Sequence, residues 1–171
     1  VIELVLGMMY REIKNQGNGD EVNREDRKEL LNKFHDAKLC LTQLNKGKDL
    51  YDPIDELEWL SGGLALKDKF QDLCDTYLEY SFKKSDKEEQ HFLVISIDDI
   101  DLNINGAYEM AEQIRKYLCT NNCIILMSLN IDQFIEVVSN YISKQVAPQE
   151  YLGATEMAQK YATKLIPMEY R

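Results

Sequence analysis

Three carboxylates stand close together at the end of an apolar run. Asp98, Asp99 and Asp101 follow the segment Phe92-Leu93-Val94-Ile95-Ser96-Ile97. Neighbouring carboxylates repel one another unless a cation or hydrogen-bond donors compensate their charge. Magnesium suits this task, because it takes hard oxygen ligands and usually only one or two of them from protein. We therefore expect a cation site at this point of the chain.

A second polar position follows the next apolar run, which is Cys123-Ile124-Ile125-Leu126-Met127-Ser128-Leu129. Asn130 comes directly after this run, and Asp132 follows two residues later. Neither run alternates polar and apolar residues, which is typical of strands buried on both faces of a parallel sheet covered by helices. In such sheets the ligand lies beyond the carboxyl ends of the strands. Asp98, Asp99 and Asn130 are therefore expected to serve one site.

The chemistry expected there is hydrolysis of a nucleotide phosphate. Asp98 would hold magnesium directly or through a water, Asp99 would orient or deprotonate the attacking water, and Asn130 would sense the terminal phosphate by a hydrogen bond. The competing interpretation is that the acids cap the following helix, since Asp is favoured near helix N-termini. Both interpretations stay open for Asp101, whereas the position of Asp98 and Asp99 directly after the apolar run favours the ion site.

The elements that must position these residues form a strand, a crossover helix and a second strand. The helix is predicted from one apolar stripe: Ala107, Met110, Ala111, Ile114, Tyr117 and Leu118. A further helix is expected over residues 131–144, with Ile135, Val138 and Ile142 inward. A short final helix would then lead to a last strand at Lys164-Leu165-Ile166-Pro167.

The upstream half predicts helices only. The first would run from Ile2 to about Lys14, and its apolar stripe is Ile2, Val5, Leu6, Met9 and Ile13. Two further seams predict a pair of antiparallel helices: Leu30, Phe34, Ala37, Leu41 and Leu44, then Leu66, Phe70, Leu73, Tyr77 and Tyr80. A polar turn at 45–48 and an acidic stretch with Pro53 and Gly62-Gly63 are expected between them.

Segment by segment, the chain resembles one family of nucleotide hydrolases. Phe92 through Asp101 resembles the Walker B segment of AAA+-like P-loop ATPases, in which four or more apolar residues precede paired acids. The form Ile97-Asp98-Asp99-Ile100-Asp101 is similar to that of KAP and STAND-type NTPases, whose segment usually reads I-D-D-L-D-R. Cys123 through Asn130 resembles their next strand, which carries the polar sensor-1 residue. Residues 5–10 and 161–167 are similar to their helix after the second strand and to the approach to their last strand.

This resemblance implies an α/β fold: a partial P-loop NTPase parallel sheet flanked by helices, with a long helical-hairpin insertion. Residues 1–171 would form one partial core, with a core helix at 1–17, the insertion at 18–90, and the Walker B and sensor-1 βαβ portion at 91–171. It also implies magnesium and ATP as cofactors, and a parent protein that hydrolyses ATP as a conformational switch acting on its other domains.

Two departures from the family pattern qualify this expectation. Leu102 stands where these families often place Arg, and no GxxxxGK[ST] phosphate-binding loop occurs in the sequence. We expect that loop upstream of Val1, so the chain alone would bind little or no ATP. An exposed sheet edge would then favour a homo-oligomer or aggregation.

Rival readings differ in what they require of the sequence. A diguanylate-cyclase-like strand would use Asp99-Ile100-Asp101 with Asn103 and Asn105, but residues 133–171 contain no Gly-Gly-Asp-Glu turn. A phosphoreceiver domain would need a longer chain after Asp98 than the sequence has. A haloacid-dehalogenase-like domain would need Gly-Thr or Gly-Val after Asp101, and neither pair follows it. The alternative that remains is a helical protein–protein interaction module without catalysis, for which Trp59 would be a surface anchor. The other interpretation of Trp59, which the sequence favours, is that it packs into the hairpin.

Composition limits the classes of partner. The net charge of −10 argues against nucleic acid held by electrostatics, and no apolar run is long enough to span a membrane. The four cysteines have no C-x-x-C spacing, which makes a zinc site improbable and indicates reduced, mostly buried thiols in a cytoplasmic protein.

Overall fold

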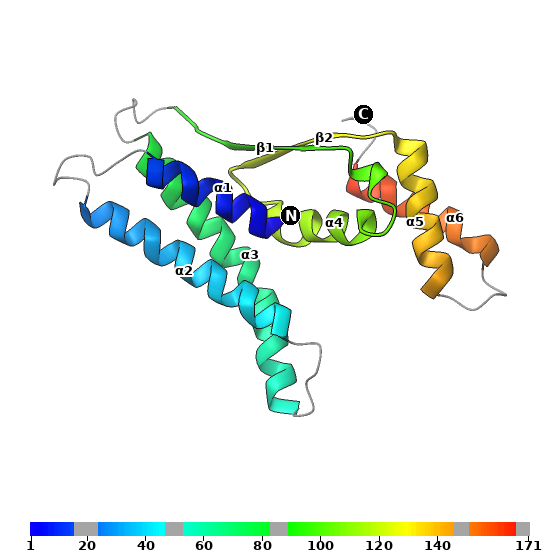
Figure 1. Cartoon of the computed structure of the whole chain (residues 1–171), viewed down its shortest axis with the longest axis horizontal. Coiled ribbons are helices and arrows are strands. Elements are labelled where there is room, and N and C mark those ends of the chain that lie inside the picture. The colour runs from blue at the N-terminus through cyan, green and yellow to red at the C-terminus, as the bar shows by residue number, and fades with distance from the viewer. Residues whose placement is uncertain (16–23, 47–52, 83–88, 146–150, 167–171) are drawn as a thin grey trace. The chain divides into compact units, whose positions relative to one another are not determined.

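The structure is a computed structural model of the 171-residue chain (Figure 1). It describes all residues except 16–23, 47–52, 83–88, 146–150 and 167–171, and only the backbone of Lys46, 53–60 and 151–152. The chain divides into two compact units. The first comprises residues 1–95 and 116–124, and the second comprises 96–115 and 125–171.

Three helices make up most of the first unit: α1 (Ile2–Asn15), α2 (Arg24–Lys46) and α3 (Pro53–Ser81). The predicted stripe of α1 is confirmed, since all five of its apolar residues are buried. The α2 and α3 seams are confirmed where they meet, and the fully buried residues include Leu30, Leu66, Phe70 and Leu73. Ion pairs from Lys33 to Asp72 and from Lys69 to Asp36 flank this contact. The predicted helical hairpin is thus present, while its status as an insertion stays a prediction.

Helix α3 begins earlier than predicted, at Pro53, and runs through Gly62 and Gly63 without a break. Proline is tolerated in the first helical turn, because the N–H that it lacks would have no helical partner there. The two glycines allow α2 to approach closely: a Cβ atom at Gly63 would lie 3.1 Å from Cδ2 of Leu44. Packing against α2 therefore keeps helical two residues that locally favour a turn.

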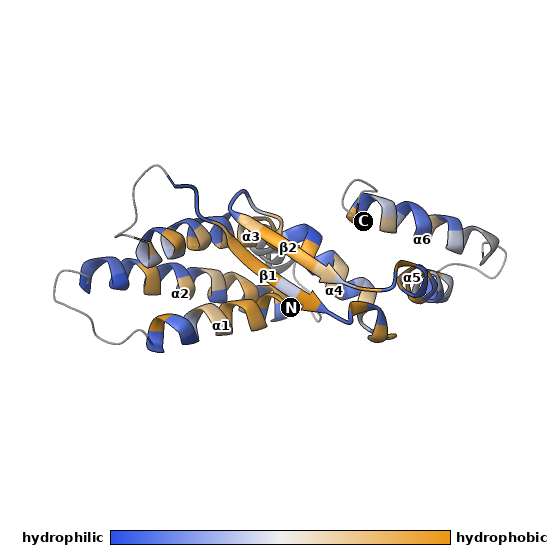
Figure 2. Ribbon diagram, turned by 90° about the horizontal axis from the view of Figure 1, so that it is seen from above, coloured by the Kyte–Doolittle hydropathy of each residue, from blue (hydrophilic) through white to orange (hydrophobic). Residues whose placement is uncertain are grey.

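A small parallel sheet joins β1 (Leu93–Asp98) to β2 (Cys123–Ser128), and helices flank it. The expectation of burial on both faces is wrong, because the side chains of each strand alternate between half-buried and exposed. Val94 and Leu126 are 53% and 54% exposed. Figure 2 shows how apolar both strands are along their length. One face of the described sheet therefore leaves apolar side chains in contact with solvent.

The second unit carries the remaining helices. A 3-10 turn, η3 (Ile100–Leu102), is followed by α4 (Ala107–Gln113), the π-helical segment η4 (Ile114–Leu118), whose residues 116–118 belong to the first unit, and then by α5 (Ile131–Gln145) and α6 (Tyr151–Leu165). The predicted crossover helix is thus α-helical only in its first half. On α5, Val138 is buried as predicted, but Ile135 and Ile142 are only half-buried and Phe134 and Val137 complete the core.

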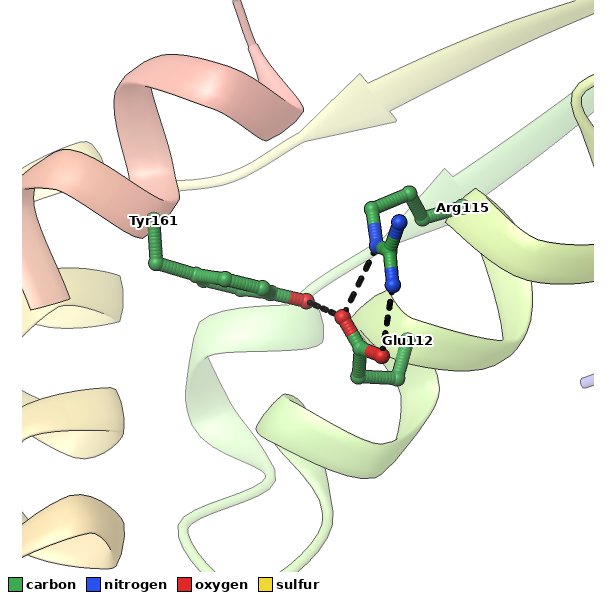
Figure 3. Close-up of polar contacts among 3 residues, drawn as sticks. All are labelled: Glu112, Arg115 and Tyr161. Atoms are coloured by element: carbon green, nitrogen blue, oxygen red, sulfur yellow. Dashed lines mark hydrogen bonds and ion pairs between the residues drawn. The ribbon is translucent and has the colours of Figure 1, made fainter.

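The end of the second unit differs from the prediction. Helix α6 continues through Leu165 and Ile166 forms a bend, so the predicted last strand is wrong for residues 164–166, and Pro167 lies outside the described residues. Helix α6 is tied to its neighbours by polar and aromatic contacts. The Tyr161 hydroxyl donates to Glu112 Oε1 at 2.9 Å, while both carboxylate oxygens of Glu112 accept from Arg115 (Figure 3).

Candidate functional site at the strand tips

The carboxyl ends of the two strands are joined by a backbone hydrogen bond. The Asp99 N–H donates to the Ser128 carbonyl oxygen at 3.2 Å, and it also lies 3.1 Å from Oδ1 of Asp98. Asn130 follows Ser128 by two residues. The structure therefore brings the chain carrying Asp98 and Asp99 against the chain that leads into Asn130, as the parallel arrangement predicts.

Asp99 has a left-handed backbone, with φ 55° and ψ 35°. Among the described residues it is the one non-glycine residue with positive φ. Aspartate adopts this conformation more readily than most residues, yet it remains uncommon and clusters at functional sites. This residue follows β1 directly, and the side chains of Asp98 and Asp99 are both exposed at the strand tip. The arrangement is that of two reachable carboxylates on a fixed backbone.

The helix-capping interpretation of the acids is not supported by the hydrogen bonds. Asp99 precedes η3 without a side-chain cap, and the cap residue of α4 is Gly106. The turn before α4 is stabilised by Asn103, whose Oδ1 accepts from the Gly106 N–H at 3.1 Å. Asp101 is 4% exposed, and its carboxylate has no hydrogen bond or ion pair with any residue in the described part of the chain. Capping by Asp101, which the sequence left open, is therefore wrong.

Asn130 caps α5, a role that the sequence analysis missed although Asn is a favoured cap residue. Its Oδ1 accepts from the N–H groups of Asp132 and Gln133, each at 3.1 Å, and its carbonyl oxygen accepts from Phe134 at 2.9 Å. The two bonds to Oδ1 occupy the acceptor atom of the side-chain amide and fix its orientation. The remaining polar group of this exposed side chain is the Nδ2 amide, which can only donate. Asn130 is thus a donor held in place at the tip of β2.

The residues fit magnesium in number and chemistry. Asp98 and Asp99 offer exposed carboxylate oxygens, and magnesium usually takes one or two such ligands while water and substrate phosphates complete its octahedron. No group of three or more His, Cys, Asp or Glu side chains converges on one point within the described residues. Asp98, the last residue of β1, could hold such an ion through its exposed carboxylate. The donor set thus matches a magnesium ion shared with a ligand better than a closed structural metal site.

An open pocket lies beside Asn130, and we call it the α5 pocket. Its volume is about 430 Å³. Its lining consists of Ile104, Asn130, Asp132, Gln133, Glu136, Val137 and Asn140. The sequence carries a signal for this face: polar residues at 132, 136 and 140 repeat every four positions along one side of the helix. The predicted site residue Asn130 therefore also belongs to a second surface feature.

All four cysteines lie in the described part of the chain, and none of them forms a disulfide bond. Cys74 is buried as expected, but Cys119 is exposed. Burial raises the pKa of the Cys74 thiol well above its usual range, and burial followed by the nearby Cys119 raises the pKa of Cys123 to about 11. Because the thiolate is the nucleophile, a raised pKa disfavours nucleophilic chemistry at Cys74 and Cys123 near neutral pH.

Comparison with known proteins leaves the strand-tip geometry as the main guide to function. No known protein-family model and no curated protein matches the chain. In the described part of the chain, no helix combines the length and the hydropathy needed to cross a bilayer.

Proposed function

We propose that this chain supplies the Walker B and sensor-1 strands of an AAA+-like P-loop ATPase of the KAP or STAND type. In this proposal the parent protein hydrolyses ATP with magnesium and uses the reaction as a conformational switch. The supporting observation is the joined tip of β1 and β2, where Asp98 and Asp99 are exposed and Asn130 follows. The phosphate-binding loop would be supplied by sequence upstream of Val1.

Each residue has a role that its geometry permits. Asp98 would hold magnesium, which supplies neutralisation of the phosphate charge. Asp99 would accept a proton from, or orient, the attacking water, since its carboxylate is exposed and its backbone is fixed by the left-handed turn. Asn130 would donate from Nδ2 to a terminal phosphate oxygen, because its Oδ1 is already committed to α5. Leu102 is 59% exposed and offers no charge where related sequences often place Arg.

The direct test is magnesium-dependent ATP and GTP hydrolysis by the polypeptide extended upstream far enough to include a phosphate-binding loop. The Asp99→Asn variant is expected to lose turnover by about 10²-fold or more, since a group acting on the water is removed. The fold should persist, because Asp99 is exposed and its backbone turn is also open to Asn. Turnover that survives Asp99→Asn unchanged would contradict the assignment.

A second variant separates the sensor role of Asn130 from its capping role. Asn130→Asp keeps an acceptor for the N–H groups of Asp132 and Gln133 and is favoured at a helix N-terminus, but it has no donor for phosphate. Its unfolding temperature should equal or exceed that of the original protein, while its turnover should fall by about 10²-fold. If the Asn130→Asp variant loses both stability and turnover, the role of Asn130 is that of a structural cap.

A protein that neither binds nor hydrolyses nucleotide after extension would favour the other candidate, a helical interaction module. In that case the α2–α3 hairpin would be the binding element and the strand-tip acids would be structural. Asp98→Asn distinguishes the two candidates, because partner binding by the hairpin would not respond to it whereas magnesium-dependent turnover would be lost.

A further inference from the structure

Two cysteines from distant parts of the sequence lie near each other in the first unit. Cys74 is on α3, where it is fully buried, and Cys123 is the first residue of β2, where it is half-buried. Burial first, and then the nearby Cys123, raise the pKa of the Cys74 thiol, so the two side chains are close enough to interact. The candidate site at the strand tips uses neither thiol.

Hydrogen bonds hold the turn before β2 against the face of α3 that carries Cys74. The Asn121 N–H donates to Oε1 of Gln71 at 2.8 Å, and Nδ2 of Asn122 donates to Oδ1 of Asp75 at 2.7 Å. The two acceptor side chains are themselves joined, since Nε2 of Gln71 donates to Oδ1 of Asp75 at 2.8 Å. Gln71 precedes Cys74 and Asp75 follows it within one helical turn. The turn is therefore fixed beside Cys74, and the first residue of β2 follows it directly.

This arrangement suits a disulfide bond. Such a bond needs two backbones at close range, with Cα atoms usually about 4–7 Å apart, and the hydrogen bonds of the turn bring the start of β2 to the side of α3. Burial disfavours the charged thiolate, but a disulfide carries no charge, so burial does not disfavour the product. The bond would also resist reduction, because a buried thiol with a raised pKa is a poor leaving group.

We propose that Cys74 and Cys123 are a site of disulfide formation, at which a low-molecular-weight disulfide such as glutathione disulfide joins α3 to the start of β2. The Cys123 thiolate attacks one sulfur of glutathione disulfide and releases one glutathione thiolate. The Cys74 thiolate then attacks the Cys123 sulfur of the mixed disulfide and releases the second glutathione. Two protein thiols are oxidised to one disulfide, glutathione disulfide is reduced to two glutathione molecules, and the two protons pass through solvent to the released thiolates.

The test treats the folded 171-residue chain with glutathione disulfide, blocks the remaining thiols with iodoacetamide and maps the disulfide bonds by digestion and mass spectrometry. The reaction is run at about pH 8.5, because the thiolate is the attacking species. The peptides that contain Cys74 and Cys123 should be joined to each other. The oxidised chain should also unfold about 5 °C or more above the reduced chain, since the bond closes a long loop.

Cys119→Ser is the matched control for Cys123→Ser, because it removes an exposed thiol from the same segment of the chain. Cys119→Ser should keep both the bond and the rise in unfolding temperature, whereas Cys123→Ser should lose both. In chain unfolded by urea, the shortest loop should close most readily, so Cys119 should pair with Cys123. The proposal is overturned if the folded chain gives this same pairing, if bonds form only between copies of the chain, or if no bond forms.

Discussion

At the scale of single residues, the second unit contains two carboxylates with opposite surroundings. Glu112 accepts hydrogen bonds from Arg115 and from Tyr161, whereas the Asp101 carboxylate has no hydrogen bond or ion pair in the described part of the chain, and its oxygens are not among the buried atoms that lack a partner. A paired carboxylate is costly to disturb, whereas one that still reaches water is not. Different effects are therefore expected when the two groups are changed.

Asp101→Asn is expected to change the free energy of unfolding by less than about 0.5 kcal/mol, because the carboxylate has no partner to lose, its oxygens reach water and the amide keeps the side-chain shape. Thermal unfolding followed by circular dichroism measures this directly. Asp68→Asn is the control, since Asp68 is exposed and its change should leave the unfolding temperature unaltered. A lower unfolding temperature for Asp101→Asn would show that the carboxylate has a stabilising partner.

Tyr161→Phe is expected to destabilise by about 1 kcal/mol, since it removes the hydroxyl that donates to Glu112. Tyr108→Phe is the matched control: Tyr108 stacks on Tyr141 with ring centroids 4.5 Å apart, and its hydroxyl has no hydrogen bond in the described part of the chain. Loss of the Tyr108 hydroxyl should change the free energy of unfolding by less than about 0.5 kcal/mol. Equal effects would show that the Glu112 bond contributes nothing.

The same tyrosine predicts a pH dependence. Burial first, and then the bond to Glu112, raise the pKa of Tyr161 above its ordinary value near 10. The folded state therefore favours the neutral phenol, so its stabilising effect is complete below pH 10 and is lost as the pH rises above that value toward the folded-state pKa. The difference in unfolding free energy between the original protein and Tyr161→Phe should shrink from pH 9 to pH 11. A difference that stays constant would contradict the shift.

At the scale of elements, local periodicity predicted what depends on local sequence. The stripe of α1, the strand–helix–strand order and most of the two hairpin seams were confirmed, because spacing alone sets which face of a helix is apolar. In the seams Leu44, Tyr77 and Tyr80 are only half-buried. The start of α3, the π-helical segment and the helical residues 164 and 165 were missed, since each depends on packing partners that a pattern does not name. For the candidate site, the sequence alone predicted that Asp98, Asp99 and Asn130 lie at the carboxyl ends of two neighbouring strands. The left-handed turn at Asp99 and the cap at Asn130 are geometric facts that spacing does not reveal.

Two helical glycines test this distinction between propensity and packing. Gly7→Ala in α1 should stabilise by about 0.5–1 kcal/mol, since alanine favours a helix and a Cβ atom there meets nothing within 4 Å. Gly63→Ala in α3 should give a smaller gain or a loss, because its Cβ atom would lie 3.1 Å from Leu44 Cδ2. Denaturant unfolding measures both. A larger gain at Gly63 than at Gly7 would show that the hairpin helices adjust freely.

At the scale of the whole molecule, a net charge of −10 opposes self-association while the apolar sheet face favours it. Val94 is 53% exposed and Ile124 is 42% exposed. Salt screens the repulsion but strengthens apolar contact. Association between copies of the chain is therefore expected to increase with ionic strength.

The double variant Val94→Thr, Ile124→Thr should reduce that association, because it makes the exposed face more polar while keeping β-branched side chains suited to strands. Sedimentation equilibrium at low and high salt measures the effect. Ile95→Thr is the control: its side chain lies on the half-buried face, so it should destabilise the fold by about 1 kcal/mol and leave association through the exposed face unchanged. Undiminished association of the double variant would exclude the sheet face as the contact.

The pairing of β1 with β2 also has a consequence for the order of folding. Leu93 bonds Asn122 and Asp99 bonds Ser128, so partners are 29 residues apart at both ends of the ladder. The α2–α3 hairpin instead closes over the short connection between Lys46 and Pro53. Loop-closure entropy and contact order both favour the more local pairing. The hairpin should therefore form first, and hydrogen-exchange labelling during refolding should show its amides protected before those of the strands.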